Sequence, residues 1–120
     1  MCCAGVLLMG VAPRIPGGGK LKLLDSYTDS GKSPYTYTFD KDLNCRLVVL
    51  TLTRDNAIPA INGDVTIGST ILEKLGDISH KDSYSAVHTY AYKCVSAHTG
   101  DILTIPHNSR NWTNITIMLF

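Results

Sequence analysis

The sequence predicts an all-β protein: one antiparallel β-sandwich of the jelly-roll type, with seven to eight strands and at most one helical turn. Three observations lead to this prediction. Thr, Val, Ile and Tyr are plentiful and Glu73 is the only glutamate, a composition that favours strands over long helices. A β-branched and leucine-rich run without Gly or Pro occupies residues 43–53. No crossover helix separates the predicted strands, and their uneven connections favour a jelly roll over a meander.

A chain of 120 residues is long enough for one domain with its own core. The formal net charge is +1, from 11 basic and 10 acidic side chains that are mixed along the chain. This balance provides no basic surface for nucleic acid or for an anionic membrane. We divide the chain into an N-terminal arm with a Pro/Gly joint, residues 1–19, and a jelly-roll domain, residues 20–120.

The N-terminal arm is apolar and has the character of an attachment element. Its larger side chains are Val6, Leu7, Leu8, Met9 and Val11. The arm lacks the basic residues that begin a secretory signal, and it is too short to cross a bilayer as a helix. Because exposed apolar surface tends to be covered, we expect the arm to dock on a partner. The prolines and glycines of residues 13–19 form a flexible or extended joint behind it.

The first half of the domain contains the expected central strand. Residues 20–24 read as a short first strand, and residues 25–34 as a polar loop. Aromatic residues alternate with threonine over residues 35–39, which predicts a half-buried strand. Within the run 43–53, the odd and the even positions from Leu47 to Leu50 are all apolar, as in a strand covered on both faces. A buried helix segment is the alternative for so short a run.

The middle of the domain is less regular. A turn at residues 62–64 precedes a short strand at residues 65–67. Residues 70–76 fit either one helical turn, with a capping box and a glycine at the far end, or a strand.

Two strong strands complete the domain. The even positions of residues 83–95 are apolar or aromatic and should face the core. A turn at residues 98–101 joins this strand to residues 102–105 as a hairpin, and residues 114–120 form a last strand that pairs inside a sheet. The predicted core includes Leu47, Val49, Leu50, Ile105, Ile117 and Leu119.

No residue pattern points to catalysis, a metal or a cofactor. Cys45 and Cys94 lie in predicted strands without zinc-type spacing, so we expect two buried thiols, with a disulfide as the alternative. The four histidines, His80, His88, His98 and His107, also lack metal-ligand spacing. Of these, His88 lies in the middle of a strand, where a hydrogen-bonded core or interface histidine is expected. No nucleophile motif is present, and we therefore expect a protein that is not an enzyme.

Aromatic residues offer one candidate binding site. Trp112 is the only tryptophan and lies in a polar loop, while Tyr35 and Tyr37 share one face of their strand. These three side chains are the candidate contacts for a glycan. The alternative is that Trp112 closes the open end of the sandwich.

A resemblance to a known family covers the chain from Tyr35 onward. It lies in the stretch Tyr37-Thr38-Phe39-Asp40-Lys41-Asp42, the run Leu47-Val48-Val49-Leu50, the strand-turn-strand of residues 97–105 and the apolar last strand. Together they resemble the small jelly-roll structural proteins of tailed bacteriophages. Members of that family are head-fibre, decoration or tail-associated proteins, often oligomeric and anchored through an N-terminal segment.

The resemblance implies a non-enzymatic virion protein, assembled in the host cytoplasm. It implies a homo-oligomer, with a trimer as the first expectation, that contacts other virion proteins through the arm. Neither nucleic acid nor membrane is an expected partner, whereas a host-surface glycan is a candidate one. The alternatives are a carbohydrate- or receptor-binding module that uses exposed aromatic residues, and a ligand-type domain of tumour-necrosis-factor or C1q shape.

Overall fold

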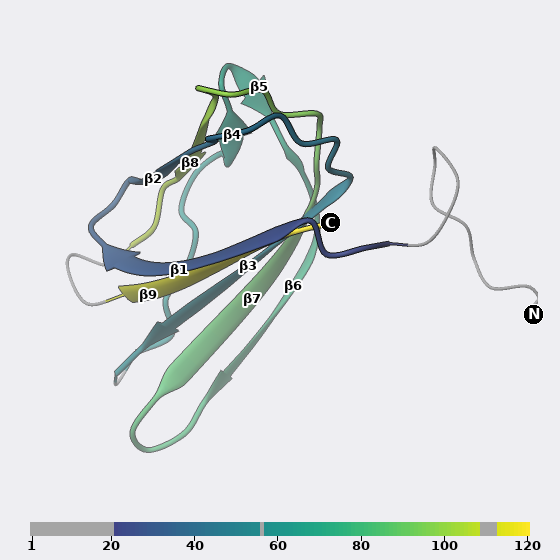
Figure 1. Ribbon diagram of the computed structural model, residues 1–120. Coiled ribbons are helices and arrows are strands. Elements are labelled where there is room, and N and C mark those ends of the chain that lie inside the picture. Colours follow the sequence, from purple (N-terminus) through teal and green to yellow (C-terminus); the bar gives the residue numbers. More distant parts are fainter. Residues whose placement is uncertain (1–20, 56, 109–112) are drawn as a thin grey trace, which may run out of the picture.

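The computed structural model describes residues 21–55, 57–108 and 113–120, and within them it shows two antiparallel sheets packed as a β-sandwich (Figure 1). The predicted all-β, antiparallel sandwich is thus confirmed, with nine strands in these residues instead of the predicted seven to eight. The strands are β1 (Asp25–Gly31), β2 (Tyr35–Thr38), β3 (Leu47–Arg54), β4 (Thr66–Ile67), β5 (Thr70–Ile71), β6 (Glu73–Lys81), β7 (Ala86–Lys93), β8 (Ile102–Ile105) and β9 (Thr113–Leu119). One sheet has five strands in the order β1-β9-β3-β7-β6, and the other has four in the order β2-β8-β4-β5.

The strands pair in a nested order once β6 is set aside. The antiparallel pairs are β1 with β9, β2 with β8, β3 with β7, and β4 with β5. This is the pairing of one long hairpin whose two arms run side by side. Two further pairs, β3 with β9 and β4 with β8, join the arms into two sheets. Strand β6 extends the five-stranded sheet beyond β7.

Strand β3 is the central strand, as predicted, but it is not covered on both faces. It lies between β9 and β7 in the five-stranded sheet. Val48, Leu50 and Leu52 are fully buried, whereas Leu47 and Val49 are only half-buried. The prediction that Leu47 and Val49 belong to the core is therefore wrong, because the four-stranded sheet packs on one face of β3 only. The other predicted core residues are buried: Leu50, Ile105, Ile117 and Leu119.

The alternation predicted for the strand around Tyr90 is confirmed. In β7, the even positions from Ala86 to Tyr92 are buried, and Cys94 beyond the strand is buried too. The core between the sheets combines these side chains with Phe39, Leu103 and Ile105 from the four-stranded side. Among the described residues, no helix has the length and hydropathy needed to cross a membrane.

Two stretches adopt a different structure from the predicted one. Residues 25–31 form β1 and not a polar loop, and residues 21–24 are not a strand. A polar sequence forms a strand here because β9 offers it an unbroken edge, from Asp25 opposite Leu119 to Gly31 opposite Thr113. Residues 70–71 and 73–81 are strands, so the alternative of a helical turn within residues 70–76 is wrong.

The predicted hairpin between residues 83–95 and 102–105 is also wrong. Strand β7 belongs to the five-stranded sheet and β8 to the four-stranded sheet. Both edges of β7 are already paired, one with β3 and one with β6, so β8 has no place beside it. The turn at Gly100, whose φ is +92°, instead carries the chain from one sheet to the other. Strand β9 pairs on both sides, as expected for the last strand.

Candidate functional site

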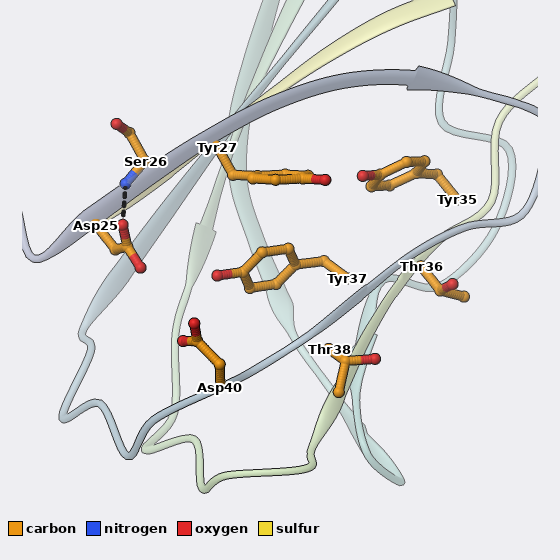
Figure 2. A pocket seen from close by; sticks show the side chains of 8 residues that line it. All are labelled: Asp25, Ser26, Tyr27, Tyr35, Thr36, Tyr37, Thr38 and Asp40. Carbon is orange, nitrogen blue, oxygen red and sulfur yellow. Dashed lines mark hydrogen bonds between the residues drawn. The ribbon is translucent and has the colours of Figure 1, made fainter.

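A cleft of about 400 Å³ opens between the edge strands of the two sheets, β1 and β2. We call it the tyrosine cleft. Figure 2 shows its lining side chains: Asp25, Ser26, Tyr27, Tyr35, Thr36, Tyr37, Thr38 and Asp40. The cleft therefore combines three aromatic rings with two carboxylates and several hydroxyl groups.

The strand registers explain why the three tyrosines meet. Tyr27 lies opposite Ile117, a buried residue of β9, so its ring points toward the interior of the sandwich. Tyr35 and Tyr37 lie opposite Ile105 and Leu103, which are buried residues of β8. Because β1 and β2 are the edge strands of different sheets, the inward-facing rings cover the open side of the core.

The rings form a packed aromatic cluster that is only partly accessible. The centroids of Tyr27 and Tyr37 are 5.0 Å apart with an interplanar angle of 49°. Tyr37 meets Phe39 edge to face, with a centroid distance of 5.2 Å. Tyr35 is 8% exposed and Tyr27 is 41% exposed. Tyr27 thus presents the most accessible ring of the cleft, and Tyr35 lies at its floor.

One carboxylate organises two of the hydroxyl groups. The Tyr35 hydroxyl donates to Asp29 Oδ2 at 3.0 Å, and the Tyr27 hydroxyl lies 3.5 Å from the same oxygen. In Figure 2 the hydroxyls of Tyr27 and Tyr35 point toward one another. Burial, followed by hydrogen bonds to Tyr27 and Asp29, raises the pKa of Tyr35 far above its usual value. Tyr35 therefore stays a protonated hydrogen-bond donor.

The other end of the cleft is acidic. Burial raises the pKa of Tyr37, and the negative charges of Asp25 and Asp40 raise it further. Figure 2 shows the Tyr37 hydroxyl pointing to the side on which these two carboxylates lie. Lys41 pairs with Asp25 across 3.5 Å at the surface. A ligand at this end would meet carboxylate acceptors, which suit hydroxyl groups and disfavour anions.

A second surface, the central part of the outside of the five-stranded sheet, contains no Asp, Glu, Lys or Arg. We call it the outer sheet face. It consists of three cross-strand rows from β1 to β6: Ser26, Met118, Val49, Ala91 and Gly76; Thr28, Thr116, Thr51, Thr89 and Ile78; Ser30, Asn114, Thr53, Val87 and His80. None of these residues is Asp, Glu, Lys or Arg, and all are exposed or half-buried. The next row toward the end of the sheet, Leu47, Lys93 and Glu73, lies outside this surface and carries one charge of each sign.

The middle row of the outer sheet face is a ladder of threonines. The Oγ1 atoms of Thr28 and Thr116 are 3.2 Å apart, and so are those of Thr51 and Thr89. These hydrogen bonds use part of the polar capacity of the hydroxyls, and the threonine methyl groups add apolar surface beside them. At the end of the row Ile78 is 75% exposed. The outer sheet face thus consists mainly of small and uncharged residues.

His88 is a hydrogen-bonded core histidine, as predicted. Its ring is 8% exposed and stacks on Tyr90 at a centroid distance of 4.1 Å. Nδ1 lies 2.8 Å from the Pro59 carbonyl oxygen, and Nε2 lies 2.7 Å from Asp77 Oδ2. The His88 hydrogen bond, and next to it Lys74, lower the pKa of Asp77. Within the described parts of the chain, no group of three or more His, Cys, Asp or Glu side chains could hold a metal ion.

Cys45 and Cys94 are free buried thiols, as predicted, although they lie just outside β3 and β7 and not within them. Cys45 is 3% exposed and Cys94 is 7% exposed, and neither is in a disulfide. Their Sγ atoms are hydrogen-bonded across 2.7 Å.

The structure brings together two of the three predicted glycan contacts. Tyr35 and Tyr37 both line the tyrosine cleft, whereas Trp112 lies outside the described residues, as do the arm residues Val6, Leu7, Leu8, Met9 and Val11. Sequence reasoning missed Tyr27, because residues 25–34 read as a polar loop. A signal was present: Asp25, Tyr27 and Asp29 alternate with small hydroxyl residues, a period of two that is typical of a strand.

No protein-family model, curated protein or solved structure matches this chain. Its function is therefore inferred from the sequence and from the geometry of the described residues.

Proposed function

We propose that the sandwich is a jelly roll and that the chain is a non-enzymatic structural protein of a virion. In this proposal it is a decoration, head-fibre or tail-associated component that assembles through its N-terminal arm and through the faces of its β-sandwich. The nested strand pairing supports the first part, because rolling up one long antiparallel hairpin produces a jelly roll. The observation that carries the second part is the outer sheet face, which has no strongly charged side chain.

The outer sheet face is large enough for a contact between copies. Five strands at about 4.8 Å spacing and about six residues at about 3.3 Å rise span roughly 24 by 20 Å, or about 500 Å². Two such faces bury about 1,000 Å² together, which reaches the lower range of specific interfaces. The four-stranded sheet is smaller, and all four of its strands are shorter than five residues. The five-stranded side is thus the better candidate for assembly.

The chemistry of the outer sheet face suits a second copy of this chain. A two-fold contact places each residue near its own symmetry mates, so a patch rich in one charge would repel itself. A face without Asp, Glu, Lys or Arg avoids that repulsion, and depletion of charge is typical of interface cores. Val49, Thr51 and Thr89 lie at its centre, where water would be excluded first.

Substitution of Thr51 tests the proposal. Thr51→Glu places a carboxylate at the centre of the outer sheet face, where a partner would bury it. The matched control is Thr104→Glu, since Thr104 is equally half-buried but faces outward from the four-stranded sheet, between Thr36 and Thr66. The mass of each full-length protein is measured in solution by light scattering over a range of concentrations. Circular dichroism checks that both variants are folded.

We expect the wild-type chain and Thr104→Glu to form the same oligomer over the same concentration range. The Thr51→Glu oligomer should dissociate into monomers at a concentration at least tenfold higher than the wild-type oligomer does. Three copies is the first expectation from the sequence, whereas a two-fold contact of the face with itself gives two. A wild-type chain that stays monomeric at high concentration contradicts homo-oligomer assembly. Equal effects of the two variants would show that the contact does not involve the outer sheet face.

A specific observation favours a second function, binding of a neutral saccharide in the tyrosine cleft. The exposed ring of Tyr27 and the half-buried ring of Tyr37 offer flat apolar surface to the C–H groups of a sugar ring. The carboxylates of Asp25 and Asp40 can accept hydrogen bonds from its hydroxyl groups. The same carboxylates disfavour sialic acid and uronic acids, so the proposal is limited to uncharged sugars.

Saturation-transfer NMR with lactose, maltose and chitotriose, followed by calorimetry, tests this second function. Tyr27→Ala removes the exposed ring and should weaken binding about fivefold to tenfold. Tyr84→Ala is the control, because Tyr84 is 84% exposed and does not line the cleft. Sialyllactose should bind more weakly than lactose. Absence of binding by all three sugars, or equal binding by Tyr27→Ala and wild type, excludes the tyrosine cleft as a saccharide site.

A further inference from the structure

We propose that Cys45 and Cys94 form a reactive dithiol that closes to an intramolecular disulfide by exchange with a small disulfide such as glutathione disulfide. The two thiols are free, and their Sγ atoms are already in contact at 2.7 Å. This modification site is separate from the outer sheet face and from the tyrosine cleft, so it does not depend on either proposed function.

Strand pairing holds the two cysteines together. Cys45 lies just before β3 and Cys94 just after β7, and these strands are antiparallel neighbours in which Leu47 lies opposite Lys93. The Cys94 amide donates to the Arg46 carbonyl at 2.7 Å, which extends the pairing by one further step. This register puts Cys94 opposite Arg46, and the chain bends at Arg46 before the regular part of β3 begins. Cys45 therefore lies on the same side as Cys94, and the two sulfur atoms meet at the end of the sheet. Bond formation needs only small side-chain movements, because the backbone is already in place.

The pair is buried but can be reached from a groove. Both sulfur-bearing side chains line a largely apolar groove of about 490 Å³ on this end of the sheet. Its other lining residues are Leu21, Arg46, Leu47, Glu73, Leu75 and Lys93. The cationic side chains of Arg46 and Lys93 outnumber the one carboxylate of the groove, Glu73, and so favour a reagent that carries carboxylates, as glutathione disulfide does. A small disulfide can thus approach the thiols without unfolding of the domain.

The two thiols have different chemical roles. A hydrogen bond from Cys94 lowers the pKa of Cys45. The same contact, together with burial, raises the pKa of Cys94 far above its usual value. Cys45 is therefore the thiol that ionises first and attacks. Cys94 keeps its proton until the second step.

The reaction proceeds by two thiol–disulfide exchanges. The Cys45 thiolate attacks one sulfur of glutathione disulfide, which forms a mixed disulfide and releases one glutathione thiolate. Cys94 then loses its proton to that thiolate or to water and attacks the Cys45 sulfur, which releases the second glutathione. In sum, two cysteine thiols and one glutathione disulfide give one Cys45–Cys94 disulfide and two glutathione thiols.

The disulfide would stabilise the domain. It links residues that are 49 positions apart and that enclose the strands from β3 to β7, which belong to both sheets. Such a link restricts the unfolded chain far more than it restricts the folded one. For a loop of this size and a domain of this length, the expected rise of Tm is on the order of 10 °C.

Peptide mapping of the full-length wild-type chain tests the proposal. The protein is equilibrated with glutathione buffers from fully reduced to fully oxidised, alkylated in denaturant, and digested with trypsin. Cleavage after Lys41, Arg46, Lys93 and Arg110 places Cys45 in residues 42–46 and Cys94 in residues 94–110. Cys2 and Cys3 remain in a different peptide, residues 1–14, so a Cys45–Cys94 link is identified without substitution.

We expect one linked peptide pair, residues 42–46 with 94–110, that increases with the oxidised fraction of glutathione and disappears on reduction. Tm should rise in parallel, and Cys94→Ser should accumulate glutathione on Cys45 and show no rise. Full alkylation of both cysteines in glutathione disulfide alone would overturn the proposal. So would a stable mixed disulfide on the wild-type chain, because it would show that Cys94 does not resolve it.

Discussion

The two adjacent valines of β3 provide the sharpest test of the sandwich, because they are chemically identical and lie on opposite faces of the sheet. Val48 is fully buried against the four-stranded sheet, and Val49 is half-buried on the outer sheet face. Val48→Ala and Val49→Ala remove the same atoms from neighbouring positions of one strand. Any difference between the two variants therefore reports the environment of each side chain.

The expected magnitudes differ clearly. Val48→Ala loses two buried methyl groups at about 0.8 kcal/mol each, and the cavity left in a closely packed core adds about 1 kcal/mol. The free energy of unfolding should fall by about 2.5 kcal/mol. Val49→Ala leaves no cavity and loses only part of this transfer free energy, so its cost should stay below about 1 kcal/mol.

Urea unfolding, monitored by circular dichroism, measures both values. An unchanged slope of the unfolding free energy against urea concentration indicates that the unfolded state is the same. Each variant is measured at low and at high protein concentration. The loss of unfolding free energy caused by Val48→Ala should not depend on protein concentration. Any loss caused by Val49→Ala that arises from contact between copies should become smaller on dilution. Equal losses at low concentration, or a larger loss at Val49, would refute the assignment of the two faces of β3.

Two further predictions concern pH dependence and the N-terminal arm. The lowered pKa of Asp77 means that its carboxylate stabilises the folded state above about pH 4, and that this contribution is lost as the pH falls through the lowered pKa. Asp77→Asn should therefore lower the unfolding midpoint at pH 7 and flatten its fall in acid, and a wild-type-like profile would contradict the role of the His88 hydrogen bond. Deletion of residues 1–16 should leave a folded domain with an unchanged β-type circular dichroism spectrum that no longer joins the particle or partner bound by the full chain. Unfolding of the truncated chain would place the arm in the core, and full assembly would place attachment on the sandwich.

Local patterns determined the class of the fold. The period of two around Tyr90 correctly predicted which side chains of β7 face the core, and the run around Leu50 correctly predicted the central strand. The alternation over residues 35–39 likewise placed Tyr35 and Tyr37 on one face. These properties follow from the geometry of a single strand, in which successive side chains point to opposite sides. They need no knowledge of the partner strand.

Only the tertiary structure decided which strands are neighbours. The pattern of β7 and β8 is that of a hairpin, yet β7 is already paired on both edges and β8 joins the other sheet. Half-burial of Val49 likewise follows from the fact that a second sheet packs on one side of β3 only. Strand pairing depends on which backbone edges remain open after the chain has collapsed, and that is a non-local property.

The candidate sites show the same division. Tyr27 could be assigned to the tyrosine cleft only once β1 was seen to pair with β9, because its own sequence is polar and resembles a loop. The contact between Cys45 and Cys94, which are 49 residues apart, depends on the antiparallel register of β3 and β7. The sequence by itself determined which side chains the chain offers for binding and redox chemistry. Main-chain hydrogen bonds between distant segments decided which of them meet, because those bonds set the register that places one side chain beside another.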